Sequence, residues 1–303
     1  MATILDGKWL SEEIQRVLQS EVADLLPRLG ERPGLGVILV GDNPASRTYV
    51  ANKEKLARRC GLETFDARLP ETATFAEVQS AIQSFNNDPR VHGVLLQLPL
   101  PAALRPRTNE LLDLILPTKD ADGLHPLNQG LMMRGEGTVL PCTPLGSMYL
   151  IDLAFSAVSP TSGRWEDVRP VDLSGKRAVV VGRSILVGRP VGIMLLERNA
   201  TVLMAHSKSP DLPALCREAD ILVAAVGVPN LVQGSWVKPG AVVIDVGINR
   251  LPSGKLTGDV EFAGVVERAA AVTPVPGGVG PMTVAMLIRN TVKAWRAQVG
   301  TRQ

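Results

Sequence analysis

Short apolar runs alternate with amphipathic stretches through the first half of the chain. The spacing of apolar residues predicts two helices. Gly61 ends the first of them, and Thr74 caps the start of the second. Strand followed by helix, repeated, is typical of parallel βαβ units, whose functional loops lie at the carboxyl ends of the strands. The predicted elements are a strand at 34–40, a helix at 45–60, a helix at 74–88, and a strand that opens the segment 91–101 and ends in a proline-containing loop.

The two ends of the chain carry helical patterns as well. Residues 1–10 suggest a short strand and a turn, followed by an amphipathic helix that we expect Ser11 to cap, with Glu13 in its first turn. Residues 281–299 form a second amphipathic pattern.

A further set of strands begins near residue 175. Apolar runs at 177–181, 219–227 and 240–249 predict buried strands, and a helix begins near Pro190. The polar, proline-bearing segment 156–172 reads as a linker or surface loop. We therefore expect an α/β protein of two α/β domains with a cleft between them. Residues 149–280 form a Rossmann-type dinucleotide-binding domain, and residues 1–148 with 281–303 form the other.

Composition narrows the function classes. The 303 residues are 45% apolar and 20% charged with a net charge of +2, which allows about two well-packed domains. No basic block stands out and aromatic residues are only 4%, so nucleic-acid binding is not expected. Three scattered cysteines and three scattered histidines predict a reducing compartment and no metal site. No signal peptide and no uncharged run of membrane-spanning length fit the sequence, so we expect a soluble, cytoplasmic protein.

Between the strand at 177–181 and the next helix lies a glycine turn, Gly182-Arg-Ser-Ile-Leu-Val-Gly188. Such a turn lets backbone N–H groups and a helix N-terminus approach a pyrophosphate. It departs from the standard G-x-G-x-x-G motif, because Ser184 replaces the middle glycine and Gly188 comes one residue late.

The end of the following strand indicates which dinucleotide binds. An NAD site usually places Asp or Glu there, but this chain offers His206, Ser207 and Lys208, with Arg183 in the turn. Hydroxyl and cationic groups suit a 2′-phosphate, which predicts NADP over NAD. A solvated strand end is the alternative.

The stretch GDNPASRTYVANK at 41–53 presents Ser46, Tyr49 and Lys53 on one predicted helix face. A phenol one turn from an ammonium can form a proton-transfer pair, or an ordinary surface pair.

Four other clusters have no obvious folding role, so each is a candidate for ligand binding, although each could also be a structural turn. They are LLQLPLP with Gln97, PTKDADGLHPLNQG with Lys119, Asp120, Asp122 and Asn128, PCTP at 141–144, and TPVPGGVGPMT at 273–283.

These motifs, together with GAVVIDVGINR and GDVEF, occur in an order that closely resembles the bifunctional methylenetetrahydrofolate dehydrogenase/methenyltetrahydrofolate cyclohydrolase family, over about residues 2–297. The resemblance implies NADP-dependent oxidation of 5,10-methylenetetrahydrofolate, followed by hydrolysis of the methenyl product to 10-formyltetrahydrofolate. It assigns the first domain to folate and catalysis and the second to NADP, and it implies a homodimer formed through the cofactor domains.

The same resemblance implies roles for individual residues. Lys53 is the key catalytic group with Tyr49 beside it, Gln97 holds the lysine, and Asp122 binds the pterin ring. The remaining substrate contacts are Ser46, Leu96, Leu98, Pro276, Gly277, Gly278, Val279 and Gly280. The cofactor contacts are Gly182, Arg183, Ser184, Gly188, Ser207 and Ile248.

Elementary chemistry agrees with these roles. Hydride loss leaves an amidinium-like cation, so the first step needs positioning more than a strong base. Hydration of that cation requires a group that takes a proton from water and returns one to a ring nitrogen, and a lysine beside a cationic substrate can do both.

Alternatives within and outside the family remain. Short-chain dehydrogenases also carry Tyr-x-x-x-Lys, but after their glycine-rich turn, whereas Tyr49 and Lys53 precede Gly182. A dehydrogenase of amino or shikimate-type acids would not explain KDADG or PGGVGPMT. Two further hypotheses are a family member with dehydrogenase activity only and a non-catalytic relative that binds folate or a nucleotide. The segment 156–172 is longer than the family's usual connection, and the formate-ligase region of trifunctional relatives is not expected.

Overall fold

The computed structural model describes residues 1–158 and 163–300, and the chain divides into two compact units. Met1–Ile14 and Pro141–Met286 form one, which we call the six-stranded unit after its main sheet. Gln15–Leu140 and Leu287–Gln303 form the three-stranded unit. The α/β fold class expected from the sequence is confirmed. The boundaries differ from the expected ones, because the first strand pairs within the six-stranded unit rather than with the strands that follow it.

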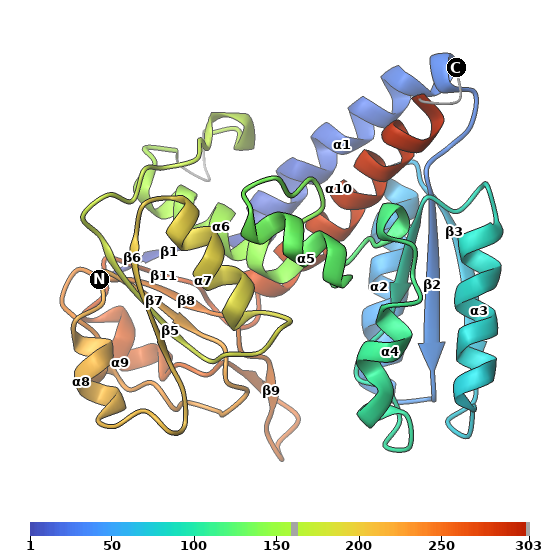
Figure 1. Ribbon diagram of the computed structural model, residues 1–303. Helices are drawn as coiled ribbons and strands as arrows, with labels where there is room; N and C mark the ends of the chain where they lie inside the picture. Colours follow the sequence, from blue (N-terminus) through green and yellow to red (C-terminus); the bar gives the residue numbers. More distant parts are fainter. Residues whose placement is uncertain (159–162, 301–303) are drawn as a thin grey trace. The chain divides into compact units, whose positions relative to one another are not determined.

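The three-stranded unit is built on a parallel sheet in the order β3-β2-β4. Its strands are β2 (Gly34–Val40), β3 (Glu63–Leu69) and β4 (Gly93–Leu96). Helices α2 (Pro44–Arg59) and α3 (Phe75–Asn87) connect them in opposite directions across the sheet. Right-handed crossovers then place the two helices on opposite faces, as Figure 1 shows. Every residue of β2 is therefore buried.

Shorter elements and two long helices complete this unit. The short ones are η1 (Arg105–Arg107), α4 (Thr108–Leu112), η2 (Pro117–Lys119) and α5 (Pro126–Met133). Helices α1 (Gly7–Leu29) and α10 (Val279–Gly300) each begin in the six-stranded unit and continue into this one.

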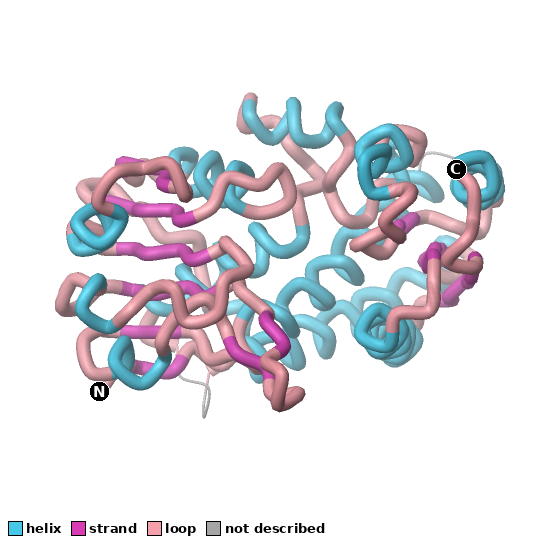
Figure 2. The backbone as a smooth tube through the Cα atoms, turned by 90° about the horizontal axis from the view of Figure 1, so that it is seen from below, coloured by secondary structure: helices cyan, strands magenta, loops and turns pink. Residues whose placement is uncertain are grey.

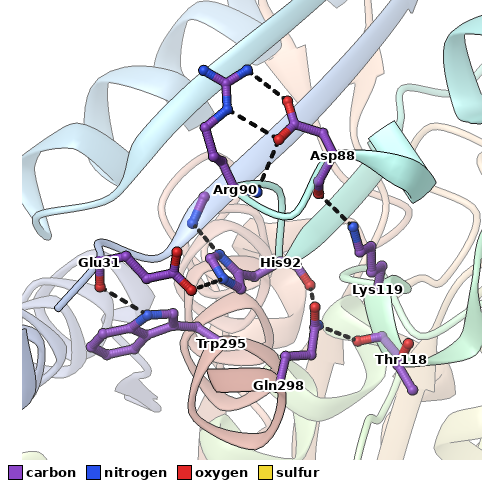
Figure 3. A network of polar contacts seen from close by, with 9 residues as sticks. Glu31, Asp88, Arg90, His92, Thr118, Lys119, Trp295 and Gln298 are labelled. Carbon is purple, nitrogen blue, oxygen red and sulfur yellow. Dashed lines mark hydrogen bonds and ion pairs between the residues drawn. The ribbon is translucent and has the colours of Figure 1, made fainter. Parts of the chain in front are cut away.

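Polar contacts hold the end of α10 in the three-stranded unit (Figure 3). The Trp295 indole is fully buried and donates to the Glu31 carbonyl oxygen. The Gln298 amide donates to the carbonyl oxygens of His92 and Thr118. His92, itself fully buried, accepts a backbone hydrogen bond at Nδ1 and lies 3.6 Å from a Glu31 carboxylate oxygen through Nε2. These contacts secure the segment that precedes β4, at the amino end of that strand.

The six-stranded unit has the parallel strand order β1-β11-β8-β7-β5-β6, and Figure 2 shows its strands running side by side. They are β1 (Thr3–Ile4), β5 (Arg177–Val181), β6 (Thr201–Ala205), β7 (Ile221–Ala224), β8 (Val242–Asp245) and β11 (Ala271–Val272). The chain reverses direction across the sheet after β6, so α7 packs on one face and the later helices on the other. The remaining elements are α6 (Cys142–Phe155), η3 (Trp165–Asp167), α7 (Gly188–Glu197), α8 (Leu212–Arg217), η4 (Gly234–Trp236), α9 (Phe262–Val266) and the antiparallel pair β9 (Asn249–Arg250) and β10 (Leu256–Thr257).

The expected cap of the first helix is wrong. The helix begins at Gly7, and the Asp6 carboxylate accepts the backbone N–H of Trp9 in the manner of an N-cap. Ser11 lies in the second turn, where its hydroxyl donates to the carbonyl oxygen of Pro281. Local sequence favoured the serine because it precedes the acidic run, whereas tertiary packing extended the helix by a turn.

The segment 156–172 contains more structure than a solvated linker. Residues 159–162 lie outside the described part of the chain. Beyond them Trp165 stacks edge-to-face on Tyr149 of α6, with ring centroids 5.7 Å apart.

The described residues contain no helix long and apolar enough to cross a membrane. Residues 1–158 and 163–300 hold no cluster of three or more His, Cys, Asp or Glu suited to a metal ion.

Candidate active site and cofactor-binding turn

Lys53 lies on α2, the helix that follows the carboxyl end of β2. Its side chain is 8% exposed, and Nζ donates a 2.9 Å hydrogen bond to Oε1 of Gln97. No carboxylate in the described part of the chain forms an ion pair with this ammonium. A buried amine held by a neutral amide, rather than locked in an ion pair, can take part in proton transfer.

Gln97 is placed by the strand that precedes it. Its backbone N–H donates to the Ile38 carbonyl oxygen, which continues the pairing of β4 with β2 by one residue. Its side-chain nitrogen donates to the carbonyl oxygen of Leu98, so the amide oxygen faces Lys53. The orientation of this amide is thus set by its two partners.

Ser46 and Tyr49 share the helix with Lys53 but differ in exposure. A turn at Gly41, which has φ of +86°, leads into α2, and the Asn43 side chain accepts the backbone N–H of Ser46. Ser46 is buried, whereas the Tyr49 side chain is 39% exposed. A large aromatic residue that stays accessible one turn from a buried lysine is suited to contact a ligand.

Within the KDADG motif, Asp120 organises the backbone of the loop. Asp120 accepts the backbone N–H groups of Gly123, Leu124 and His125 and the side chain of Asn128. These contacts give Asp120 and Asn128 folding roles that the sequence did not reveal.

Lys119 also has a folding role at the end of α3. Its Nζ donates to the carbonyl oxygen of Asp88 (Figure 3) and to that of Phe85. Asp120 forms a parallel bridge with Val94, and two residues further along each segment are Asp122 and Leu96. Asp122, which is half-buried, follows this bridge by two residues.

The PGGVG segment belongs to the six-stranded unit. Gly277 has φ of +111° and its carbonyl oxygen accepts the N–H of Lys8. A Cβ on Gly7 would lie 1.9 Å from the carbonyl oxygen of Gly278, so the loop packs directly on the start of α1. Gly277 therefore supplies a left-handed backbone, and Gly7 permits the close backbone packing. Helix α10 begins at Val279, within the motif.

The glycine turn has the backbone that a phosphate cradle needs. Gly182 has φ of +124°, and a Cβ on Gly188 would lie 2.2 Å from the Gly182 carbonyl oxygen. Ser184 accepts the Val187 N–H through Oγ and the Arg189 N–H through its carbonyl oxygen, which closes the turn onto α7. The turn thus delivers a ten-residue helix N-terminus to the carboxyl edge of the parallel sheet.

Cationic and hydroxyl side chains surround this turn. Arg183, Ser207 and Lys208 are exposed, and Gly182 donates to the carbonyl oxygen of Ala205 at the end of β6. A helix N-terminus with nearby cations fits the phosphates of a dinucleotide. Ile248 follows β8, is 44% exposed, and would lie 3.4 Å from a Cβ on Gly280. Its neighbourhood is therefore shared with the PGGVG segment.

Two family models match this chain. The catalytic domain of tetrahydrofolate dehydrogenase/cyclohydrolase matches residues 5–122, and the NAD(P)-binding domain of the same family matches residues 166–299. The chain belongs to the tetrahydrofolate dehydrogenase/cyclohydrolase family. This confirms the resemblance found in the sequence.

Relatives of similar length support the same membership. The bifunctional protein FolD of Synechococcus sp. is 52% identical over 97% of this chain and 95% of its own length. FolD of Dichelobacter nodosus is 48% identical over 98% and 97%. The crystal structure of the bifunctional FolD enzyme of Campylobacter jejuni aligns with a TM-score of 0.89 and 44% identity, over 98% of this chain and 99% of its own. FolD of Trypanosoma brucei, solved with NADP cofactor and inhibitor, aligns with a TM-score of 0.89 and 38% identity over 100% and 99%.

Within this family member, the structure gathers the sequence-derived residues into two groups. Lys53, Gln97 and Asp122 lie in the three-stranded unit, and the glycine turn, Ser207, Ile248 and residues 276–280 lie in the six-stranded unit. Sequence reasoning missed the role of Asp245 and Asp259, which are both buried at the carboxyl end of β8. The available signal was an aspartate at the end of an apolar strand in GAVVIDVGIN and another in GDVEF.

Proposed function

We propose that this chain catalyses two successive steps on one-carbon folates, with NADP as its cofactor. The first is oxidation of 5,10-methylenetetrahydrofolate to the 5,10-methenyl cation, and the second is hydrolysis of that cation to 10-formyltetrahydrofolate. The observation that carries the proposal is the buried Lys53 ammonium hydrogen-bonded to Gln97, in a family member with a dinucleotide-binding turn. The NADP complex of the Trypanosoma brucei relative supports the choice of cofactor.

In the oxidation, the C–H bond of the methylene bridge breaks and its hydride leaves with both electrons. NADP+, when bound, supplies the hydride acceptor. The protein's part is to position the folate and exclude water, and we assign this to Tyr49, Ser46 and Asp122, with Leu96, Leu98 and residues 276–280 as further contacts. The cofactor contacts that we assign are Gly182, Arg183, Ser184, Gly188, Ser207 and Ile248.

In the hydrolysis, water adds to the bridge carbon of the methenyl cation. Lys53, in its unprotonated form, takes the proton that this water loses. The bond from the bridge carbon to the ring nitrogen N5 then breaks, and N5 receives that proton from Lys53. The added hydroxyl loses its own proton to solvent as its oxygen becomes the formyl carbonyl. Gln97 keeps Nζ in one place through both transfers. Water is consumed and one proton is released overall.

A spectrophotometric assay of the purified protein tests the proposal. The protein receives 5,10-methylenetetrahydrofolate with NADP+, or with NAD+ in a parallel cell, and reduced cofactor and methenyl product are followed together. We expect reduced cofactor to form with NADP+ while the methenyl species stays low. Methenyl accumulation limited only by spontaneous hydrolysis would show a dehydrogenase alone. No turnover with either cofactor would leave a binding protein.

We propose further that the protein is a cytoplasmic homodimer joined through its six-stranded units. The edge strand β6 carries Met204, which is 38% exposed, and α7, which packs on β6, carries Leu196, which is 62% exposed. Such an edge can pair with a second copy. Cys60, Cys142 and Cys216 are buried and form no disulfide with one another, which suits a reducing compartment. Light scattering should give twice the 32.4 kDa chain mass, and a monomer mass would contradict the assembly.

A further inference from the structure

Two buried aspartates at the carboxyl end of the six-stranded sheet have no part in the chemistry above. Asp259 is fully buried and Asp245 is 4% exposed. Asp245 ends β8, and Asp259 lies fourteen residues later, after the β9–β10 pair. Buried carboxylates are costly unless they are well hydrogen-bonded, so their partners indicate what they do.

Asp259 holds the loop that follows β7. Its Oδ2 accepts the backbone N–H of Val226 at 2.6 Å and that of Gly227 at 2.9 Å. Its Oδ1 accepts the Asn249 side-chain amide at 2.9 Å. One carboxylate thus fixes the loop after β7 and the first residue after Ile248.

Asp245 in turn holds Asp259. Its Oδ1 accepts the N–H groups of Gly247 and Asp259, and its Oδ2 accepts that of Val260. The carboxylates occupy space that no side chain could share. A Cβ on Gly258 would lie 1.7 Å from Asp245 Oδ2, and one on Gly247 would lie 2.2 Å from Asp259 Oδ1.

The loop held by Asp259 touches the glycine turn directly. A Cβ on Gly182 would lie 2.2 Å from the carbonyl oxygen of Ala225, the residue before Val226. Ile248 stands between Gly247 and Asn249, each of which is held by one of the two aspartates. The pair therefore reaches two of the three backbone segments to which we assign cofactor contacts, the glycine turn and the segment of Ile248, and Ser207 lies outside its reach.

We propose that Asp259 is a positioning residue for NADP: its carboxylate fixes the loop at 225–228 and the segment around Ile248, so that the glycine turn and Ile248 meet the cofactor in one arrangement. This inference rests on the proposed use of NADP by this unit. It predicts that loss of the carboxylate weakens cofactor binding, while the folate side of the reaction is spared.

Asp259→Ala and Asp259→Asn form the test. Alanine leaves two backbone N–H groups without their acceptor, whereas the asparagine oxygen can still accept both, and Asn249 can turn its amide to match. The measurements are the NADP+ dissociation constant by fluorescence or calorimetry, the KM for NADP+, the KM for folate, and kcat. We expect Asp259→Ala to raise the NADP+ dissociation constant and KM about 10-fold or more, with the folate KM changed less than about 2-fold, and Asp259→Asn to recover most of the loss.

Asp152→Ala is the matched control. Asp152 is also a buried carboxylate of the six-stranded unit that accepts a backbone N–H, from Val171, but it lies on α6 and contacts no assigned cofactor segment. It should lower thermal stability and leave NADP+ affinity near wild type. If Asp259→Ala does not fold, Asn249→Ala and Asp259→Asn carry the comparison.

Equal NADP+ affinity in wild type and Asp259→Ala would overturn the inference, as would a loss of kcat at unchanged NADP+ KM. If Asp152→Ala lost as much NADP+ affinity as Asp259→Ala, the loss in Asp259→Ala would be explained by lower stability of the unit, and the positioning role would be rejected. Absence of NADP+ binding in the wild type would instead count against the proposed function.

Discussion

At the scale of single residues, Lys53 differs from a surface lysine in burial and in partner. Its ammonium is nearly inaccessible and is held by an amide oxygen. Holding an amine this way leaves its charge uncompensated by any described carboxylate, which suits a group that must give and take a proton.

We expect Lys53→Ala to reduce cyclohydrolase activity by about 100-fold or more, because a positioned acid–base group contributes on that order. The dehydrogenase activity should fall less, since hydride transfer needs positioning rather than a base. Stopped-flow decay of the methenyl absorbance measures the first, and cofactor reduction the second.

Lys55→Ala is the control, because Lys55 lies on the same helix and is exposed. A Lys53→Ala enzyme that retains the wild-type cyclohydrolase rate would remove Lys53 from the mechanism.

Gln97 gives a second residue-scale prediction. Gln97→Ala removes the acceptor of Nζ and should lower cyclohydrolase activity by about 10-fold, the value of one hydrogen bond to a charged group. Gln97→Glu keeps the size but offers a carboxylate, which would hold Lys53 as an ion pair and should also slow hydrolysis. Steady-state rates at saturating substrate measure both. An unimpaired Gln97→Glu enzyme would show that a neutral partner is unnecessary.

At the scale of elements, the N-terminus of α3 tests how much a local capping motif contributes to stability, at a position that has no assigned role in catalysis. Thr74 and Glu77 form a capping box: the threonine hydroxyl accepts the Glu77 N–H, and the glutamate accepts the Thr74 N–H. Thr74→Ala should cost about 1 kcal/mol of unfolding free energy, measured by urea denaturation. Both activities should stay at wild-type values, and a specific loss of activity without loss of stability would contradict this assignment.

The elements also show what sequence can reveal. The strand at 34–40 and the cap at Thr74 followed from apolar spacing and local side-chain chemistry, and the structure confirms both. The prediction that Ser11 caps α1 failed because the helix begins earlier. The Ser11 hydroxyl instead bonds to the carbonyl oxygen of Pro281, which is distant in sequence. Asp120 could not be told from Asp122 by pattern, since only the folded loop shows which carboxylate collects three backbone N–H groups.

At the scale of the whole molecule, Asp245 links folding stability to pH. Burial raises the pKa of its carboxyl from 3.8 to about 7, with nearby Asp259 adding to the rise and three backbone N–H groups opposing it. Between these two values the native state binds the proton that the unfolded chain has lost. The contribution of Asp245 is therefore fully present below pH 3.8 and is lost as pH rises through about 7.

The expected result is that Asp245→Asn flattens the pH dependence of stability between about pH 4 and 7, because an amide does not titrate. Urea unfolding at a series of pH values, wild type minus variant, isolates this group from other carboxyls. Parallel curves for the two proteins would show that Asp245 is ionised throughout.

The division of the chain has a consequence for its synthesis. The three-stranded unit needs Leu287–Gly300 as well as residues from the first half, and Asn290 reaches back to the carbonyl oxygens of Ala121 and Leu140. In the other unit β1 pairs with β11, which is made about 270 residues later. On the ribosome, neither unit can close its core until nearly the whole polypeptide has emerged. A translation-arrested chain that ends before β11 should be protease-sensitive in both halves, and release of the full-length chain should protect them together.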